Sequence, residues 1–184
     1  MNRLSRTIGM LAAATLVAVA GVACHPSFDP KVYAANSDAL FAASLNQFSK
    51  KHWDEAAQGF EQLTRDLPAR DPLLPLSYYY LGQAQEKNGD HLLAAQSFTR
   101  IAEAFPDDSL AAPALLASGR AYEQMWRKPE LDATYGASAE TALQQLVSLY
   151  PDSKLVPEAN KELARLDELF ARKDLQTGDH YVRR

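Results

Sequence analysis

The sequence predicts an all-α solenoid built from about three helix–turn–helix repeats and a terminal helix. It shows no alternating strand pattern bounded by hairpin turns, and only 8 of its 184 residues are glycine, which argues against a β fold. Residues 78–106 contain one complete unit of two helices and a turn. The second helix of this unit recurs on both sides with the same internal spacing. An ordinary bundle of amphipathic helices is the alternative, but it has no reason to repeat the same offsets.

The unit at residues 78–106 shows why a repeat is expected. Gly82 and Ala84 are small residues that let a second helix approach the first, and an Asn-Gly-Asp turn at residues 88–90 separates the two. The second helix then places apolar residues on one face and ends at a proline: Ala94, Phe98, Ile101 and Pro106. This combination is the tetratricopeptide (TPR) pattern, whose period is about 34 residues.

The pattern of a small residue, two apolar residues and a proline occurs three times in the chain. The other copies are Ala56, Phe60, Leu63 and Pro68, and then Ala139, Leu143, Leu146 and Pro151. The first residues of successive copies lie 38 and 45 residues apart, which exceeds the usual period. We therefore expect enlarged connections between the helices rather than longer helices.

The N-terminus predicts a lipoprotein signal peptide over residues 1–23. Two arginines precede an apolar run of 15 residues, from Ile8 to Val22, and small residues then lead to Cys24. The run is shorter than the roughly 20 residues that a spanning helix needs, so a signal-anchor is the weaker alternative. Cys24 is the only cysteine and cannot form an internal disulfide. The Val-Ala-Cys sequence at 22–24 resembles the bacterial lipobox, which implies a lipidated Cys24; a plain cleavage site is the other alternative.

Residues 24–36 are expected to carry the lipid and to act as a tether. The segment after Cys24 contains two prolines and little periodicity. Several acyl chains, at about 0.8 kcal/mol per buried methylene, would hold the domain at a membrane without a spanning helix. His25 follows the cysteine, where an aspartate would imply retention at the inner membrane by resemblance to enteric sorting. The predicted location is therefore the periplasmic face of the outer membrane.

The solenoid is expected over residues 37–174. Its first repeat should begin with Ser37 as an N-cap, and its second helix should run from Trp53 to Asp66 with acidic residues at the positive end. Prolines make residues 68–75 a stiff connection to the second repeat.

The third repeat should start with a helix from Ala111 to Glu123. A long helix from Leu155 to Arg172 carries leucines on one face and can cap the array as a half repeat. Residues 175–184 are expected to form a C-terminal tail.

The third repeat contains eight extra residues, within the stretch 126–136. Function concentrates in loops on rigid scaffolds, so this widened loop is a candidate contact site through Trp126, Arg127 and Tyr135. The alternative is that its aromatic side chains fold back onto the neighbouring helices.

Charge and motifs argue against nucleic acid, metal and catalysis. Removal of residues 1–23 leaves 17 basic and 23 acidic residues, and no basic stripe with interleaved aromatics suits phosphate binding. The four histidines are scattered, with no metal-ligand spacing. Catalytic glycine or serine motifs are missing as well. We therefore expect a protein that is not an enzyme and has no cofactor.

The chain resembles the BamD (YfiO-type) outer-membrane lipoproteins. The resemblance rests on the runs at residues 53–60, 105–109, 150–153 and 171–181 together with the lipobox. It implies a scaffold of the machinery that inserts β-barrel proteins, binding a BamA-like barrel subunit and unfolded outer-membrane protein segments. The chain is shorter than full-length members, so a TPR adaptor of another envelope complex, Tol–Pal or peptidoglycan-associated, is the alternative.

Stacked TPR units present their first helices on a concave surface that receives peptides. Mixed apolar and polar residues on that surface would bind apolar side chains and fix backbone or terminal charge. Alignment of the first helices places nine residues there: Phe41, Leu45, Phe48, Tyr79, Gln83, Glu86, Leu116, Arg120 and Glu123. Several of them could equally be packed core.

Overall fold

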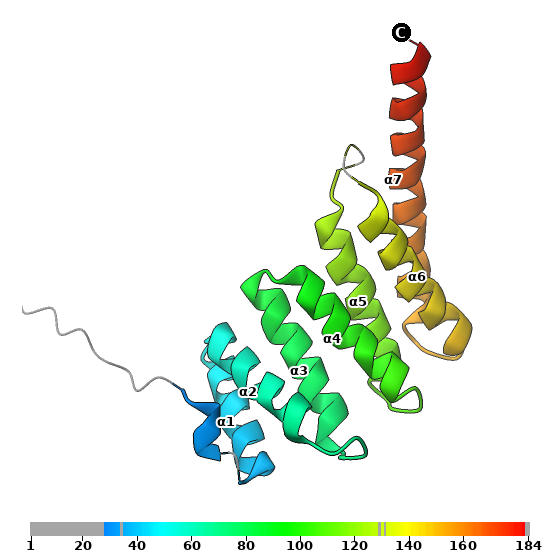
Figure 1. The fold of residues 1–184 in the computed structure, drawn as a ribbon. Helices are drawn as coiled ribbons and strands as arrows, with labels where there is room; N and C mark the ends of the chain where they lie inside the picture. Colours follow the sequence, from blue (N-terminus) through cyan, green and yellow to red (C-terminus); the bar gives the residue numbers. More distant parts are fainter. Residues whose placement is uncertain (1–27, 34, 129, 131, 183–184) are drawn as a thin grey trace, which may run out of the picture.

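The computed structural model describes residues 28–33, 35–128, 130 and 132–182, and within them the chain is helical without strands (Figure 1). A short 3-10 helix, η1, is followed by seven α-helices. Their bounds are η1 Pro30–Tyr33, α1 Ser37–Ser49, α2 Trp53–Asp66, α3 Leu73–Asn88, α4 His91–Ala104, α5 Ala111–Met125, α6 Thr134–Leu149 and α7 Val156–Val182.

Each helix packs mainly on the next one along the chain, from α1 to α7. The pairs α1–α2, α3–α4 and α5–α6 form three repeats, and α7 packs on α6 as the first helix of an unfinished fourth (Figure 1). The all-α solenoid predicted from the repeated spacing is therefore confirmed. A chain whose units contact only their neighbours is the defining feature of this architecture.

Glycines set the close approach of the two helices within the second and third repeats. A Cβ atom at Gly82 would lie 2.7 Å from the ring of Phe98, and one at Gly119 would lie 2.7 Å from Leu143. Both partners are buried apolar residues of the second helix. In these two repeats, a glycine of the first helix thus meets one of the recurring apolar residues of the second helix.

Three clusters of buried side chains run along the solenoid. Phe60 lies in the first-repeat cluster, which α1 and α2 form together with residues of α3. Phe98 lies in a second cluster, formed by α4 and α5, and Leu143 in a third cluster, formed by α5, α6 and α7. Leu166 of α7 is fully buried in the third cluster. The recurring apolar residues Phe60, Phe98 and Leu143 therefore lie in three successive core clusters.

The starts of three helices, α1, α3 and α6, differ from the sequence prediction. Asn36, not Ser37, is the N-cap of α1, and its side chain accepts a hydrogen bond from the Ala39 amide at 2.9 Å. Helix α3 starts at Leu73 and includes Pro75, because the first turn of a helix has free amide positions that proline tolerates. Helix α6 begins at Thr134, within the predicted loop.

The predicted tether and tail are both partly wrong in the described residues. Phe28 and Tyr33 pack against the first-repeat cluster, with ring centroids 6.2 Å apart, so this segment is docked rather than free. At the other end, α7 continues as far as Val182, and its last turns project beyond the rest of the solenoid (Figure 1). Cys24 and the predicted signal peptide lie outside the described residues.

Among the helices of the described chain, none combines the length and the apolar character required to cross a bilayer.

Candidate functional site

A hollow of about 350 Å³ opens between α3, α5 and the start of α7, on the side formed by the first helices of the repeats. Five of the nine residues predicted for this surface line it: Tyr79, Gln83, Glu86, Leu116 and Arg120. The first three lie on α3 at intervals of four and three residues, so they share one face of that helix. The volume falls at the lower end of the usual range for ligand clefts, about 300–1,000 Å³, and suits a short peptide segment.

The floor and one wall of the hollow are apolar. Phe98 of α4 lines it and is 1% exposed, and its ring meets Tyr79 edge-on with centroids 5.6 Å apart. Leu116 of α5 is also buried. Leu155, just before α7, adds a further apolar side chain. The hollow therefore combines an apolar base with polar side chains at its rim.

The predicted residues of α1 lie outside this hollow. Phe41, Leu45 and Phe48 are half-buried and pack in the first-repeat cluster. The rings of Phe41 and Phe48 meet Tyr80 of α3 at 6.0 and 5.7 Å. These side chains therefore join the first two repeats as much as they present a surface.

Arg120 is held in ion pairs with α7. Its guanidinium donates to Glu158 and, at 3.2 Å, to Glu162. Arg165 continues the series by pairing with Glu162 at 2.6 Å and with Glu123 of α5. Five alternating charges thus tie the third repeat to α7.

Burial and pairing act on the pKa values of this charge series. Burial alone would lower the pKa of Arg120, but its hydrogen bonds with Glu158 and Glu162 and their negative charge raise it overall. Burial raises the pKa of Glu123, and attraction by Arg165 only partly opposes this. Arg120 is therefore a permanent but already neutralised cation.

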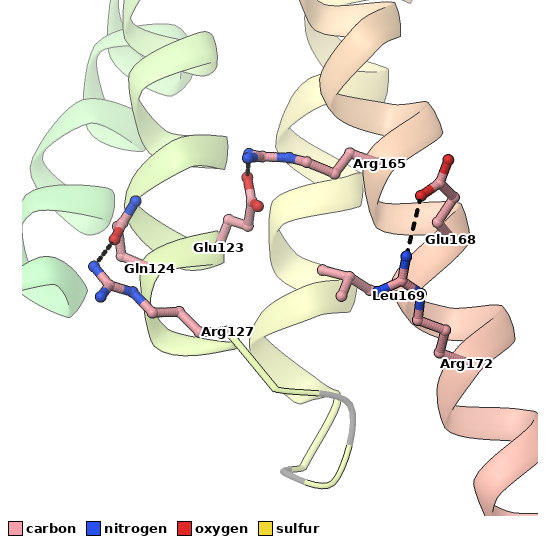
Figure 2. A pocket seen from close by; sticks show the side chains of 7 residues that line it. All are labelled: Glu123, Gln124, Arg127, Arg165, Glu168, Leu169 and Arg172. Atoms are coloured by element: carbon pink, nitrogen blue, oxygen red, sulfur yellow. Dashed lines mark hydrogen bonds and ion pairs between the residues drawn. The ribbon is translucent and has the colours of Figure 1, made fainter.

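A second hollow of about 500 Å³ lies farther along α5 and α7 and includes Glu123 and Arg127 (Figure 2). Arg127 is exposed and donates to Gln124. Arg172 pairs with Glu168 at 3.7 Å along α7, and both side chains are exposed. Glu123 and Arg127, predicted for different surfaces, thus line the same hollow.

The aromatic residues of the widened loop are packed inward. Trp126 is fully buried, with its ring 4.5 Å from that of Phe170, and the site of a Gly136 Cβ is occupied by the Trp126 ring. Tyr135 stacks on Tyr122 at 6.5 Å. The prediction of Trp126 as a contact residue is therefore wrong, because the side chain closes the core beneath the loop.

Sequence reasoning missed the contribution of α7 to both hollows. Glu158 lines the first, and Arg165 and Leu169 line the second. A signal was present: Arg165 follows Arg120 by 45 residues, the same interval as between Pro106 and Pro151. Arg120 lies on α5, the first helix of the third repeat, so this interval aligns α7 with the first helices of the repeats.

The part of the chain that the structure describes contains no cluster of three or more His, Cys, Asp or Glu residues able to hold a metal ion.

Comparison with known proteins agrees with this architecture. Residues 33–184 match the family model described as YfiO, outer membrane lipoprotein. None of the curated proteins matches the chain. Among solved structures, the TPR domain of Arabidopsis OM64 is similar in fold, with 17% identity and a TM-score of 0.53 over 72% of this chain and 97% of that one. The family match covers most of the sequence, and the chain belongs to the YfiO family of outer membrane lipoproteins.

Proposed function

We propose that this chain is a lipid-anchored TPR scaffold of the machinery that assembles β-barrel proteins in the outer membrane. It would bind a barrel subunit of the BamA type, or unfolded barrel segments, on its concave surface. The family match supports the envelope role. The observation that carries the binding role is the hollow in which Tyr79, Gln83 and Leu116 gather from two repeats.

The arrangement suits peptide binding rather than catalysis. The hollow offers an apolar base for side chains, and its polar rim can fix a peptide backbone. Arg120, the cation at the rim, is occupied by two glutamates and is not poised to act on a substrate. Lipid on Cys24 would hold this hollow near the periplasmic face of the membrane.

A pull-down in mild detergent from the native envelope tests this proposal. The tagged wild-type chain should retain the barrel-assembly subunit, identified by mass spectrometry. A Cys24→Ser form should leave the membrane fraction. Recovery of Tol–Pal or peptidoglycan-associated proteins in place of the barrel subunit would contradict the assembly role and leave an adaptor of another complex.

Replacement of either of two alanines by arginine tests whether the partner binds in the hollow. Ala117 lines the hollow, and Ala104 is exposed at the end of α4. Ala117→Arg should fill the hollow and abolish partner recovery, whereas Ala104→Arg should leave recovery unchanged. Equal recovery by both variants would show that the partner binds elsewhere on the solenoid.

A further inference from the structure

The charges of the concave hollow are unequal. Glu86 and Glu158 line it as carboxylates, and Arg120 is its one basic residue. Arg120 pairs with Glu158 and also with Glu162, a residue of α7 that does not line the hollow. The guanidinium is thus neutralised within the fold, and the remaining charge of the hollow is negative.

Glu86 carries this remaining charge. Its side chain is half-buried, and no hydrogen bond or ion pair joins this carboxylate to any residue that the structure describes. The neighbouring Gln83 on the same face of α3 is likewise half-buried without a side-chain partner among the described residues. A carboxylate partly removed from water gains more from a cation than an exposed one does.

We propose that the hollow selects a polypeptide segment that places a lysine or arginine side chain beside Glu86 and an apolar side chain against Leu155, which lines the hollow and is partly exposed. This inference rests on the proposed peptide-binding function and names the chemistry of its ligand. The aliphatic stem of a basic side chain would cover the apolar wall, and its cation would meet both the Glu86 carboxylate and the ring of Tyr79.

The same charges disfavour an acidic ligand. A peptide carboxylate in the hollow would lie near Glu86, and Arg120 has no unpaired charge to offer it. Of the residues predicted for this surface, Arg120 is therefore unsuited to bind a peptide carboxylate, and Glu86 is suited to bind a positive charge.

Three short peptides provide the test. They share one apolar sequence, are blocked at both ends to remove terminal charge, and differ only in a central Lys, Gln or Glu. Binding to the full-length protein in detergent is followed by fluorescence anisotropy. We expect affinity to fall in the order Lys, Gln, Glu, and the Lys peptide to weaken as salt is added.

Variants of Glu86 connect the preference to this residue. Glu86→Gln should weaken the Lys peptide by about fivefold and leave the Gln peptide unchanged. Glu86→Lys should reverse the order and favour the Glu peptide. Glu103→Gln is the matched control, because Glu103 is exposed on α4, does not line the hollow and pairs with Arg100 at 3.5 Å.

Three results would overturn the inference: no binding of any peptide, equal affinity for all three, or an unchanged preference in Glu86→Gln. These outcomes are separable from failure of the proposed function. Recovery of the barrel subunit without any charge preference would remove only the inference about the ligand. A preference for the Lys peptide together with recovery of a different envelope complex would remove only the assembly role.

Discussion

Gly82 marks the closest approach of α3 and α4. Its missing Cβ leaves room for the Phe98 ring, three atoms of which would lie within 2.7–2.9 Å of that Cβ. Phe98 is buried and cannot turn away without disturbing the core. We expect Gly82→Ala to destabilise the protein by about 1–3 kcal/mol, seen as a lower urea midpoint.

A glycine-to-alanine substitution on α7 is the control, because we do not expect it to destabilise the protein. No heavy atom lies within 4 Å of the Cβ position at Gly178, which is in the exposed end of the helix. Gly178→Ala should be neutral or should stabilise α7 by up to about 1 kcal/mol. A loss of stability at Gly178 equal to that at Gly82 would show that alanine itself, rather than the contact with Phe98, is responsible.

Glu123 gives a pH dependence of defined sign. Burial raises its pKa above the ordinary value of 4.5, so the folded protein binds this proton more tightly than the unfolded chain does. Its contribution to stability therefore falls as the pH rises from 4.5 through the raised pKa. Urea midpoints of the wild type should increase relative to those of Glu123→Gln when the pH is lowered through this interval. Parallel profiles for the two proteins would contradict the assignment.

At the scale of the helices, Trp126 joins three elements. It ends α5, fills the space left by Gly136 of α6 and contacts Phe170 of α7. Truncation of a fully buried aromatic side chain costs about 3–5 kcal/mol. We expect Trp126→Ala to lose this amount, with Arg127→Ala, an exposed neighbour, within about 0.5 kcal/mol of the wild type.

Hydrogen exchange should show where that loss falls. In a solenoid each repeat is stabilised by its neighbours, so a defect remains local. Amides of α6 and α7 should lose protection in Trp126→Ala, while those of α1 and α2 should keep theirs. A uniform loss of protection would mean that the whole array unfolds as one unit.

The sequence predicts elements well where local signals mark both ends. The bounds of α2, Trp53–Asp66, are those predicted, because an acidic first turn and a following proline delimit the helix. The end of α7 was misplaced because no glycine cap or proline stops it. Gly178, at an exposed position, does not break the helix.

The hollow was predictable only in part. Tyr79, Gln83 and Glu86 follow from helical periodicity on one element. Glu158 lines the hollow from the start of α7. Its pairing with Arg120 depends on how α7 packs against the third repeat. A local pattern predicts which face a residue occupies but not which distant side chain neutralises it.

At the scale of the whole molecule, a docked segment follows the predicted lipidation residue, Cys24, closely in the sequence. Phe28 packs beside Gly59 of α2, and only three residues lie between it and Cys24. The four residue-to-residue steps from Cys24 to Phe28 span at most about 14 Å when extended. Lipid on Cys24 would therefore keep the first repeat close to the membrane, while α7 ends on the other side of the solenoid (Figure 1).

Energy transfer from single fluorophores to a membrane-surface acceptor tests this orientation. Lipidation would consume the only native cysteine, so Val32→Cys or Leu175→Cys would each supply one free thiol at a position that is 77% or 72% exposed. We expect strong transfer from position 32 and weak transfer from position 175 in the lipid-anchored protein on vesicles. Leu93→Cys on α4, 49% exposed, should give an intermediate value.

The short segment between Cys24 and Phe28 requires that position 32 stay near the membrane surface. Weaker transfer from position 32 than from position 175 would therefore exclude a docked anchor segment. Equal transfer from all three positions would instead show that the solenoid lies along the membrane.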